Sequence, residues 1–133
     1  MVKKEIHVSW AEFDDMAKQL VEKIKEMGRK FDGIHGIPRG GLILAVYLSH
    51  HLGLRLIENP ANISLNTLIV DDISDNGDTL QKYKAHFIIC LYVSLWTKMP
   101  PNIYLRIKQS PNDWIYFPWE HEDQETEKDN TEG

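Results

Sequence analysis

Apolar residues recur at helical spacing near the start of the chain. Ser9 and Glu12 stand three positions apart, as in a capping box, in which each side chain satisfies an amide at a helix N-terminus. Apolar positions then follow every three or four residues as far as Met27, and Gly28 is a typical helix stop. The pattern predicts a helix over about residues 10–27. Its apolar face comprises Phe13, Met16, Ala17, Leu20, Val21, Ile24 and Met27.

Short apolar runs alternate with helix-like segments through the rest of the chain. A buried helix is predicted over residues 42–52, and an amphipathic helix is predicted after Gly77. This alternation predicts an α/β domain with a mostly parallel, twisted sheet and helices on both faces. Such sheets bind ligands at the carboxyl ends of their strands, where the loops at 37–41 and 71–79 lie. The helix after Gly77 would place Leu80, Tyr83, Lys84 and Phe87 on one face. The predicted strands are 31–37, 54–57, 66–70, 88–95, 103–107 and 114–117.

The charged residues are unevenly distributed along the chain. The 133 residues carry a formal net charge of −5, but residues 120–133 hold seven acidic residues and one lysine. We therefore assign residues 1–119 to one domain and expect residues 120–133 to form an acidic, disordered tail. The nearly neutral domain has no basic stripe, which argues against nucleic-acid binding.

Neither a membrane segment nor a signal sequence is expected. No apolar run reaches the roughly 20 residues of a membrane span, and the N-terminus begins no apolar segment of signal-peptide length. The single cysteine, Cys90, lies within an apolar run, so we expect a buried free thiol in a reducing compartment. These features predict a cytoplasmic protein.

The acidic loop after the strand at 66–70 is a candidate binding site. Adjacent carboxylates at Asp71 and Asp72 repel each other, and ribose hydroxyls or Mg²⁺ would relieve that repulsion. Residues 75–79 then turn into a helix, whose first amides can bind a phosphate dianion. Gly77 would allow close approach of that phosphate. The alternative for this segment is a plain acidic loop with a helix N-cap.

A second loop, at residues 36–41, offers complementary chemistry. Arg39 presents a fork of donors that suits phosphate oxygens. Gly40 and Gly41 expose backbone amides at the start of the next helix. Alone, the loop could equally be a Pro-Gly turn, but it lies one strand–helix unit before the acidic loop.

The two loops together resemble those of type I phosphoribosyltransferases. In that family an apolar strand ends in two acidic residues and a D-T-G-x-T loop, and an earlier strand ends in a Ser/Pro-Arg-Gly-Gly loop. Asn76 stands where the family usually has Thr or Ser, and Asp78 where it tolerates Gly or a basic residue. Many members have a non-proline cis peptide in the earlier loop, which here would be Pro38–Arg39. The matching positions of the acidic loop are Val70, Asp71, Asp72, Asp75, Gly77 and Thr79.

This resemblance implies a site for phosphoribosyl pyrophosphate (PRPP). Asp71 and Asp72 would hold the ribose hydroxyls and Mg²⁺, the metal partly through those hydroxyls or through water. Arg39 and the amides of Gly40 and Gly41 would bind the pyrophosphate. The remaining PRPP-binding residues would be Asp75, Asn76, Gly77, Asp78 and Thr79.

A closer resemblance is to the 6-oxopurine branch, especially the xanthine-guanine phosphoribosyltransferases. Its members open with a strand, a tryptophan (here Trp10) and an amphipathic helix, and they close with a Trp-Ile…Pro-Trp-Asp/Glu segment. By this resemblance Lys98 would donate to the purine O6, Trp114 would stack on the purine, and the Ile115 backbone would bind the base edge. Alone, Lys98 is more often a solvated loop charge and Trp114 a core residue.

The implied reaction moves the 5-phosphoribosyl group of PRPP to guanine, xanthine or hypoxanthine, as in purine salvage. Asp75 is the candidate general base near purine N7, and Arg39 would balance the charge of the leaving pyrophosphate. The family also implies Mg²⁺ as cofactor and a homodimer or homotetramer.

One part of the family's fold is short in this chain. Members usually carry a flexible hood between the second and third sheet strands, and only residues 58–67 separate those strands here. We therefore expect the hood to be reduced or absent. A second hypothesis follows, in which the chain is a PRPP- or nucleotide-binding regulator with little catalysis. A flavodoxin-like phosphate-binding domain is a third, but it leaves the three aspartates Asp71, Asp72 and Asp75 unexplained.

Overall fold

The computed structural model describes residues 4–121, so the predicted tail at 120–133 lies almost entirely outside the described residues. No helix within the described range is both long enough and apolar enough to cross a membrane. In chain order the elements are β1 (Lys4–His7), α1 (Trp10–Met27), β2 (Gly33–Gly36), α2 (Gly40–Leu52), a 3-10 turn (Pro60–Asn62), β3 (Thr67–Ser74), α3 (Asp78–Gln81), β4 (Phe87–Ser94), β5 (Arg106–Lys108) and β6 (Asp113–Tyr116).

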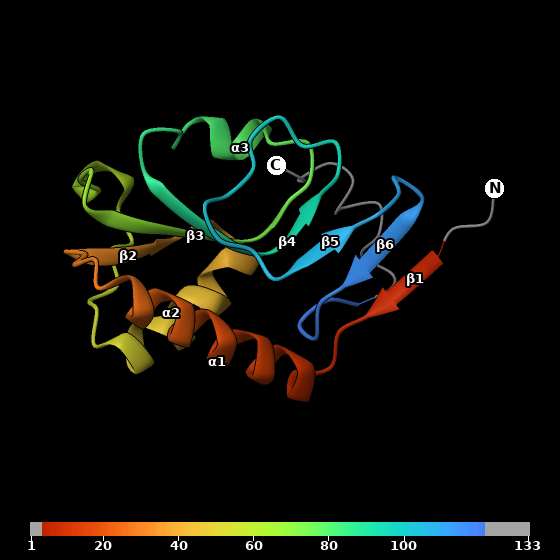
Figure 1. Cartoon of the computed structure of the whole chain (residues 1–133), viewed down its shortest axis with the longest axis horizontal. Coiled ribbons are helices and arrows are strands. Elements are labelled where there is room, and N and C mark those ends of the chain that lie inside the picture. The colour runs from red at the N-terminus through yellow and green to blue at the C-terminus, as the bar shows by residue number, and fades with distance from the viewer. Residues whose placement is uncertain (1–3, 122–133) are drawn as a thin grey trace.

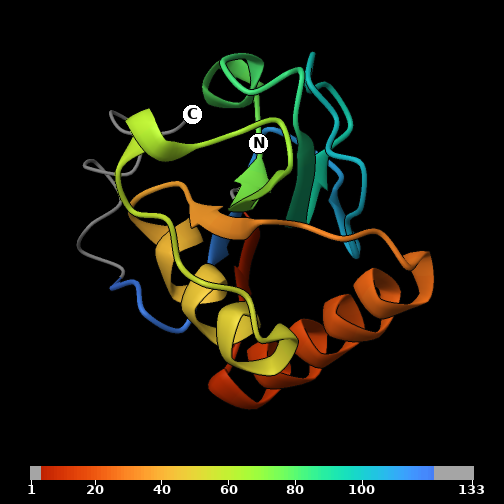
Figure 2. The ribbon, with the colours of Figure 1, turned by 90° about the vertical axis from the view of Figure 1, so that its left-hand side faces the viewer.

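The strands form two parallel sheets. The larger has the order β2-β3-β4-β5, and the smaller pairs β1 with β6. Helices α1 and α2 lie on one side of the larger sheet and α3 lies on the other (Figures 1 and 2). The smaller sheet follows beyond β5 (Figure 1). The prediction of a mostly parallel sheet flanked by helices is confirmed.

The main core lies between the larger sheet and the pair α1 and α2. Helix α1 starts with the predicted capping box: the Glu12 amide donates to the Ser9 hydroxyl at 3.0 Å, and the Ser9 amide donates to the Glu12 carboxylate at 3.2 Å. Its predicted apolar face is buried except for Met27. Strand β4 is buried over nearly its whole length, as a central parallel strand requires, and Cys90 within it is a buried free thiol.

Strand β3 extends beyond the predicted end at Val70. The backbone of Asp71, Ile73 and Ser74 continues to pair with β4, so the acidic pair lies within the strand and not after it. A polar side chain does not end a parallel strand when the neighbouring strand still offers backbone partners.

The helix predicted after Gly77 is shorter than expected. It ends at Gln81, and Phe87, predicted to lie on its apolar face, begins β4 instead. Only Leu80 of that face is fully buried. One anchored residue gives little packing energy to offset the cost of ordering further turns.

Two other predicted strands are reduced to short contacts. The segment at 54–57 contributes a single bridge between Leu56 and Ile34. At the start of the segment at 103–107, the amides of Asn102 and Ile103 both donate to the Ile88 carbonyl of β4. This shared acceptor interrupts the regular ladder, and continuous pairing with β4 begins only at β5.

The connection where family members carry a hood holds only the 3-10 turn Pro60–Asn62. Its end is fastened to the segment before β2, because the carboxylate of Asp32 accepts hydrogen bonds from the hydroxyls of Ser64 and Thr67. The amide of Ser64 also donates to the Thr67 hydroxyl at 2.9 Å. The connection is thus both short and held against the body.

Candidate functional site

Two glycines bring the loop after β2 directly onto β3. Gly40 and Gly41 begin α2, and a Cβ on Gly41 would lie only 2.5 Å from the Val70 carbonyl oxygen. A Cβ on Gly40 would collide with the Asp72 carboxylate. The Ile37 amide donates to the same Val70 carbonyl at 2.9 Å. The two predicted loops therefore lie against each other, and only glycine fits where they touch.

The peptide bond Pro38–Arg39 is cis, as the family resemblance implied. Arg39 is exposed and occupies the N-cap position of α2. A guanidinium at a helix N-terminus adds its charge to the positive end of the helix dipole. The position suits an anionic group such as a pyrophosphate.

The acidic pair on β3 holds its two carboxylates in place through the local backbone. The Asp72 amide donates to Asp71 Oδ1, and the Ile73 amide donates to Asp72 Oδ1, both at 2.8 Å. Burial, and then the neighbouring Asp72 carboxylate, raise the pKa of Asp71 well above its ordinary value. A divalent cation or a pair of hydroxyl donors would offset this cost.

The loop from Asp75 to Thr79 turns tightly under a neighbouring segment. Gly77 has a φ of 93°, and a Cβ there would lie 2.7 Å from the Met99 amide nitrogen. The side chain of Asn76 accepts a hydrogen bond from the Asp78 amide at 2.9 Å. The oxygen of Asn76 thus shapes the loop, and its NH₂ group is the part of the side chain that could donate to a phosphate.

The segment at residues 95–99 packs over this loop and is joined to it by hydrogen bonds. The Ser74 hydroxyl donates to the Met99 carbonyl at 2.8 Å and lies 2.9 Å from the Thr97 hydroxyl. The Lys98 amide donates to the carbonyl of Asn76 at 3.1 Å. The Lys98 side chain forms an exposed ion pair with Asp78. The lysine predicted to contact a purine is therefore brought to the phosphate loop.

Asp75 is buried, and a residue that the sequence did not single out holds it. The Nζ atom of Lys108, the last residue of β5, lies 3.0 Å from Asp75 Oδ2, and the two side chains are 9% and 8% exposed. Asp75 Oδ1 has no hydrogen-bond partner among the described residues. The sequence signal that could have identified Lys108 is its position at the end of a strand. Because β5 pairs in parallel with β4, its carboxyl end lies at the edge of the sheet where ligands bind.

Trp114 and Ile115 lie on β6, in the smaller sheet. Trp114 is half-buried, whereas the side chain of Ile115 faces the main core. The next residue, Tyr116, stacks on His7 of β1 at 4.9 Å between ring centroids. Trp114 and Ile115 therefore lie on a different sheet from Asp71 and Asp72, which belong to β3.

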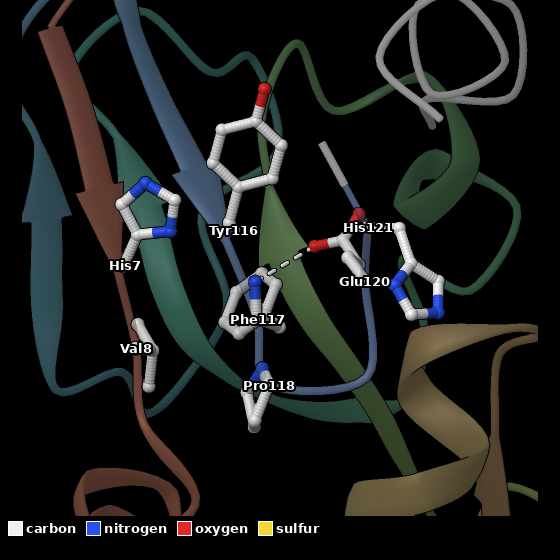
Figure 3. A pocket seen from close by; sticks show the side chains of 7 residues that line it. All are labelled: His7, Val8, Tyr116, Phe117, Pro118, Glu120 and His121. Atoms are coloured by element: carbon white, nitrogen blue, oxygen red, sulfur yellow. Dashed lines mark hydrogen bonds between the residues drawn. The ribbon is translucent and has the colours of Figure 1, made fainter. Parts of the chain in front are cut away.

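A pocket of about 330 Å³ lies beside the ends of β1 and β6 (Figure 3). Figure 3 shows the side chains of His7 and Tyr116 from the two paired strands on one side of this pocket. The Phe117 amide donates to the Glu120 carboxylate at 2.9 Å and so bends the chain after β6 (Figure 3). The other residues that line the pocket are Val8, Phe117, Pro118, Glu120 and His121.

Among the described residues, no three His, Cys, Asp or Glu side chains gather into a metal-binding group. Mg²⁺ often binds through one or two carboxylates and completes its shell with water and substrate phosphates. Asp71 and Asp72 are suited to that type of site.

Among the solved structures that match this chain, three examples cover nearly its full length. A purine phosphoribosyltransferase from Pyrococcus horikoshii is 34% identical, with a TM-score of 0.76, and the match covers 89% of this chain and 95% of that one. The xanthine-guanine-hypoxanthine phosphoribosyltransferase of Helicobacter pylori is 23% identical over 94% of this chain and 99% of its own, with a TM-score of 0.71. A hypothetical protein from Neisseria gonorrhoeae, solved with bound ppGpp, is 19% identical over 97% and 96%, with a TM-score of 0.73.

No protein-family model matches the chain. The two lower identities establish the fold, whereas the match to the P. horikoshii enzyme extends to the sequence. The glycine-dependent contact between the two loops, the cis peptide and the acidic pair are all in the positions that the loop motifs implied. The chain therefore belongs to the type I phosphoribosyltransferase family.

Proposed function

We propose that the chain transfers the 5-phosphoribosyl group of PRPP to guanine, xanthine or hypoxanthine, in purine salvage. The observation that carries this proposal is the buried Asp75 carboxylate, whose Oδ1 has no partner among residues 4–121. An unpaired buried acceptor costs about 1–3 kcal/mol, so a ligand N–H at this place is strongly favoured. The 34% identity to a purine phosphoribosyltransferase supports a purine as that ligand.

In this reaction, purine N9 forms a bond to C1′ of the ribose. The bond from C1′ to the pyrophosphate oxygen breaks, and its electron pair leaves with the pyrophosphate. Asp75 Oδ1 accepts the N7 proton of the base as N9 bonds. Arg39 and the amides of Gly40 and Gly41 balance the charge on the leaving group. Asn76, Gly77, Asp78 and Thr79 anchor the 5′-phosphate.

The acidic pair is proposed to position the ribose. The carboxylates of Asp71 and Asp72 accept hydrogen bonds from its hydroxyls, and their oxygens also fit Mg²⁺. When bound, Mg²⁺ would neutralise part of the pyrophosphate charge. The raised pKa of Asp71, caused by burial and by Asp72, supports this assignment because either partner would favour the ionised carboxylate.

Base recognition is proposed to involve Lys98, Trp114 and the Ile115 backbone. Lys98 is exposed and its partner Asp78 is exposed too, so the amine can leave that ion pair at small cost. We also propose that the protein is cytoplasmic, acts as a homodimer or homotetramer, and does not bind nucleic acid.

The function is tested by incubating the protein with PRPP, Mg²⁺ and each of guanine, xanthine, hypoxanthine and adenine. Release of pyrophosphate together with the matching nucleoside monophosphate is the expected result. Asp75→Asn should lower the rate by roughly 10²–10⁴-fold, and an unchanged rate would refute the base role. Lys98→Ala should weaken purine binding more than PRPP binding, and equal losses would refute the O6 contact.

A second candidate function is a PRPP- or nucleotide-binding regulator. The short connection held by Asp32 favours it, because that segment has no length to close over a reacting centre. The N. gonorrhoeae protein with bound ppGpp shares the fold. Tight binding of PRPP or of a nucleotide, without turnover of any base, would support this candidate over the transferase.

A further inference from the structure

Lys108 and Asp75 form a buried ion pair at the edge of the candidate site. Lysine is almost never buried unless it is paired, and here both side chains are less than a tenth exposed. The ion pair between Lys18 and Asp14 has a similar length, 2.9 Å, but both its side chains are about half exposed. Burial makes the pair with Asp75 far more sensitive to the loss of either partner.

Three contacts fix Asp75 and its lysine in one arrangement. The Ser94 hydroxyl on β4 donates to the Asp75 backbone carbonyl, while Lys108 donates to Oδ2. The ring of Trp96 covers the ammonium, with Nζ 5.4 Å from the ring centroid. The main chain and one carboxylate oxygen of Asp75 are therefore held, and Oδ1 is the oxygen left without a partner among the described residues.

Lys98, the other lysine of the candidate site, forms an exposed ion pair and does not pair with Asp75. Lys98 pairs with Asp78, and both side chains are more than half exposed. Of the two lysines, only Lys108 forms an ion pair with Asp75 among the described residues.

We propose that Lys108 is the positioning residue for Asp75, holding Oδ2 so that Oδ1 faces the N–H of the incoming base. This inference rests on the proposed transferase function. It adds a residue on β5 that acts through Asp75 and makes no contact with substrate.

A double-mutant cycle tests this role. The four proteins are the wild type, Lys108→Met, Asp75→Asn and the double variant, with Lys18→Met as a matched control for loss of an exposed lysine–aspartate pair. Lys108→Met should lower kcat by roughly 10- to 100-fold with less than about a threefold change in KM for PRPP. In the Asp75→Asn background the same change should alter kcat by less than about twofold, because the lysine then has no carboxylate to position.

Two further readouts separate positioning from support of the fold. Lys108→Arg should recover most of the rate, since it restores a cation and a donor. The double variant leaves no unpaired buried charge, so its melting temperature should lie above that of Lys108→Met.

Distinct results overturn distinct claims. A wild type without turnover refutes the transferase function and this inference with it. An active wild type whose Lys108→Met variant is folded and equals the Lys18→Met control refutes the positioning role alone. A loss in Lys108→Met that persists at full size in the Asp75→Asn background also refutes it, because the lysine would then contact substrate directly.

Discussion

The phosphate side and the base side of the molecule are built in different ways. On the proposed phosphate side, an added carbon would collide at each of three glycines. Gly41 lies against the backbone of β3, Gly40 against the Asp72 side chain, and Gly77 against the segment at 97–99. On the proposed base side, Trp114 and Ile115 lie on a two-stranded sheet, and their assigned contacts use a side chain and an isolated backbone group. Under the proposed function, anion binding therefore depends on chain geometry, whereas base selection depends on replaceable side chains.

The largest effect is expected from Gly41→Ala. Its Cβ would lie 2.5 Å from the Val70 carbonyl and 3.1 Å from the Asp71 Cα, so α2 must move off β3. We expect PRPP affinity to fall by about 100-fold or more, measured by isothermal titration calorimetry, since small displacements at such sites cost about that much. Gly28→Ala is the control, because a Cβ there meets nothing within 4 Å and should cost stability alone. Equal PRPP affinity in both variants would contradict the close-contact model.

Trp114→Ala should produce an intermediate effect confined to the base. Stacking on an aromatic ring contributes roughly 1–3 kcal/mol per base, which corresponds to about a 5- to 150-fold increase in KM for the purine. The KM for PRPP should stay within about twofold. A parallel rise in both constants would show that the smaller sheet also supports the phosphate side.

Asp71→Asn should stabilise the fold while it weakens ribose binding. Because the pKa of Asp71 is raised in the folded protein, its ionisation disfavours folding, and stability falls as the pH rises from about 4 towards the folded pKa. The amide can still accept the hydrogen bond from the Asp72 backbone. Urea unfolding should show a gain of about 1–2 kcal/mol at pH 7.5 and a smaller gain at pH 4.5. A gain that is equal at the two pH values would contradict the assignment to this carboxyl group.

The smallest effect is expected from Asp78→Asn. The exposed ion pair of Asp78 with Lys98 contributes less than about 1 kcal/mol, so stability should hardly change. PRPP should bind a few-fold more tightly, since a carboxylate no longer lies in the phosphate loop. The gain should shrink at high salt. Weaker PRPP binding would indicate that the carboxylate caps α3 productively.

Much of the fold followed from periodicity, and the exceptions have physical causes. Helix α1 was predicted to its ends because the capping box and Gly28 mark them locally. Strand β3 was predicted too short, since pairing with β4 carries its backbone past Asp71, and α3 was predicted too long, since only Leu80 is firmly anchored. Such outcomes depend on neighbours that periodicity does not reveal.

The site divides in the same way. The cis peptide was expected because the motif residues that carry it are contiguous in sequence. Both loops were expected at the carboxyl ends of their strands, but the glycine contact between them was not predicted. Lys108 was missed because its contact with Asp75 spans 33 positions and depends on where β5 joins the sheet. The roles assigned to Lys98, Trp114 and Ile115 remain predictions.

Cys90 lies opposite Asp71 in the register of β3 and β4. Burial, followed by the nearby Asp71 and Asp72 carboxylates, raises the pKa of this thiol well above its ordinary value, so it stays protonated. Its S–H stretching vibration absorbs in an infrared window free of other protein bands and responds to the local electric field. The protein thus contains a built-in vibrational probe, and neutralisation of the acidic pair by a bound Mg²⁺ would shift its frequency without any label.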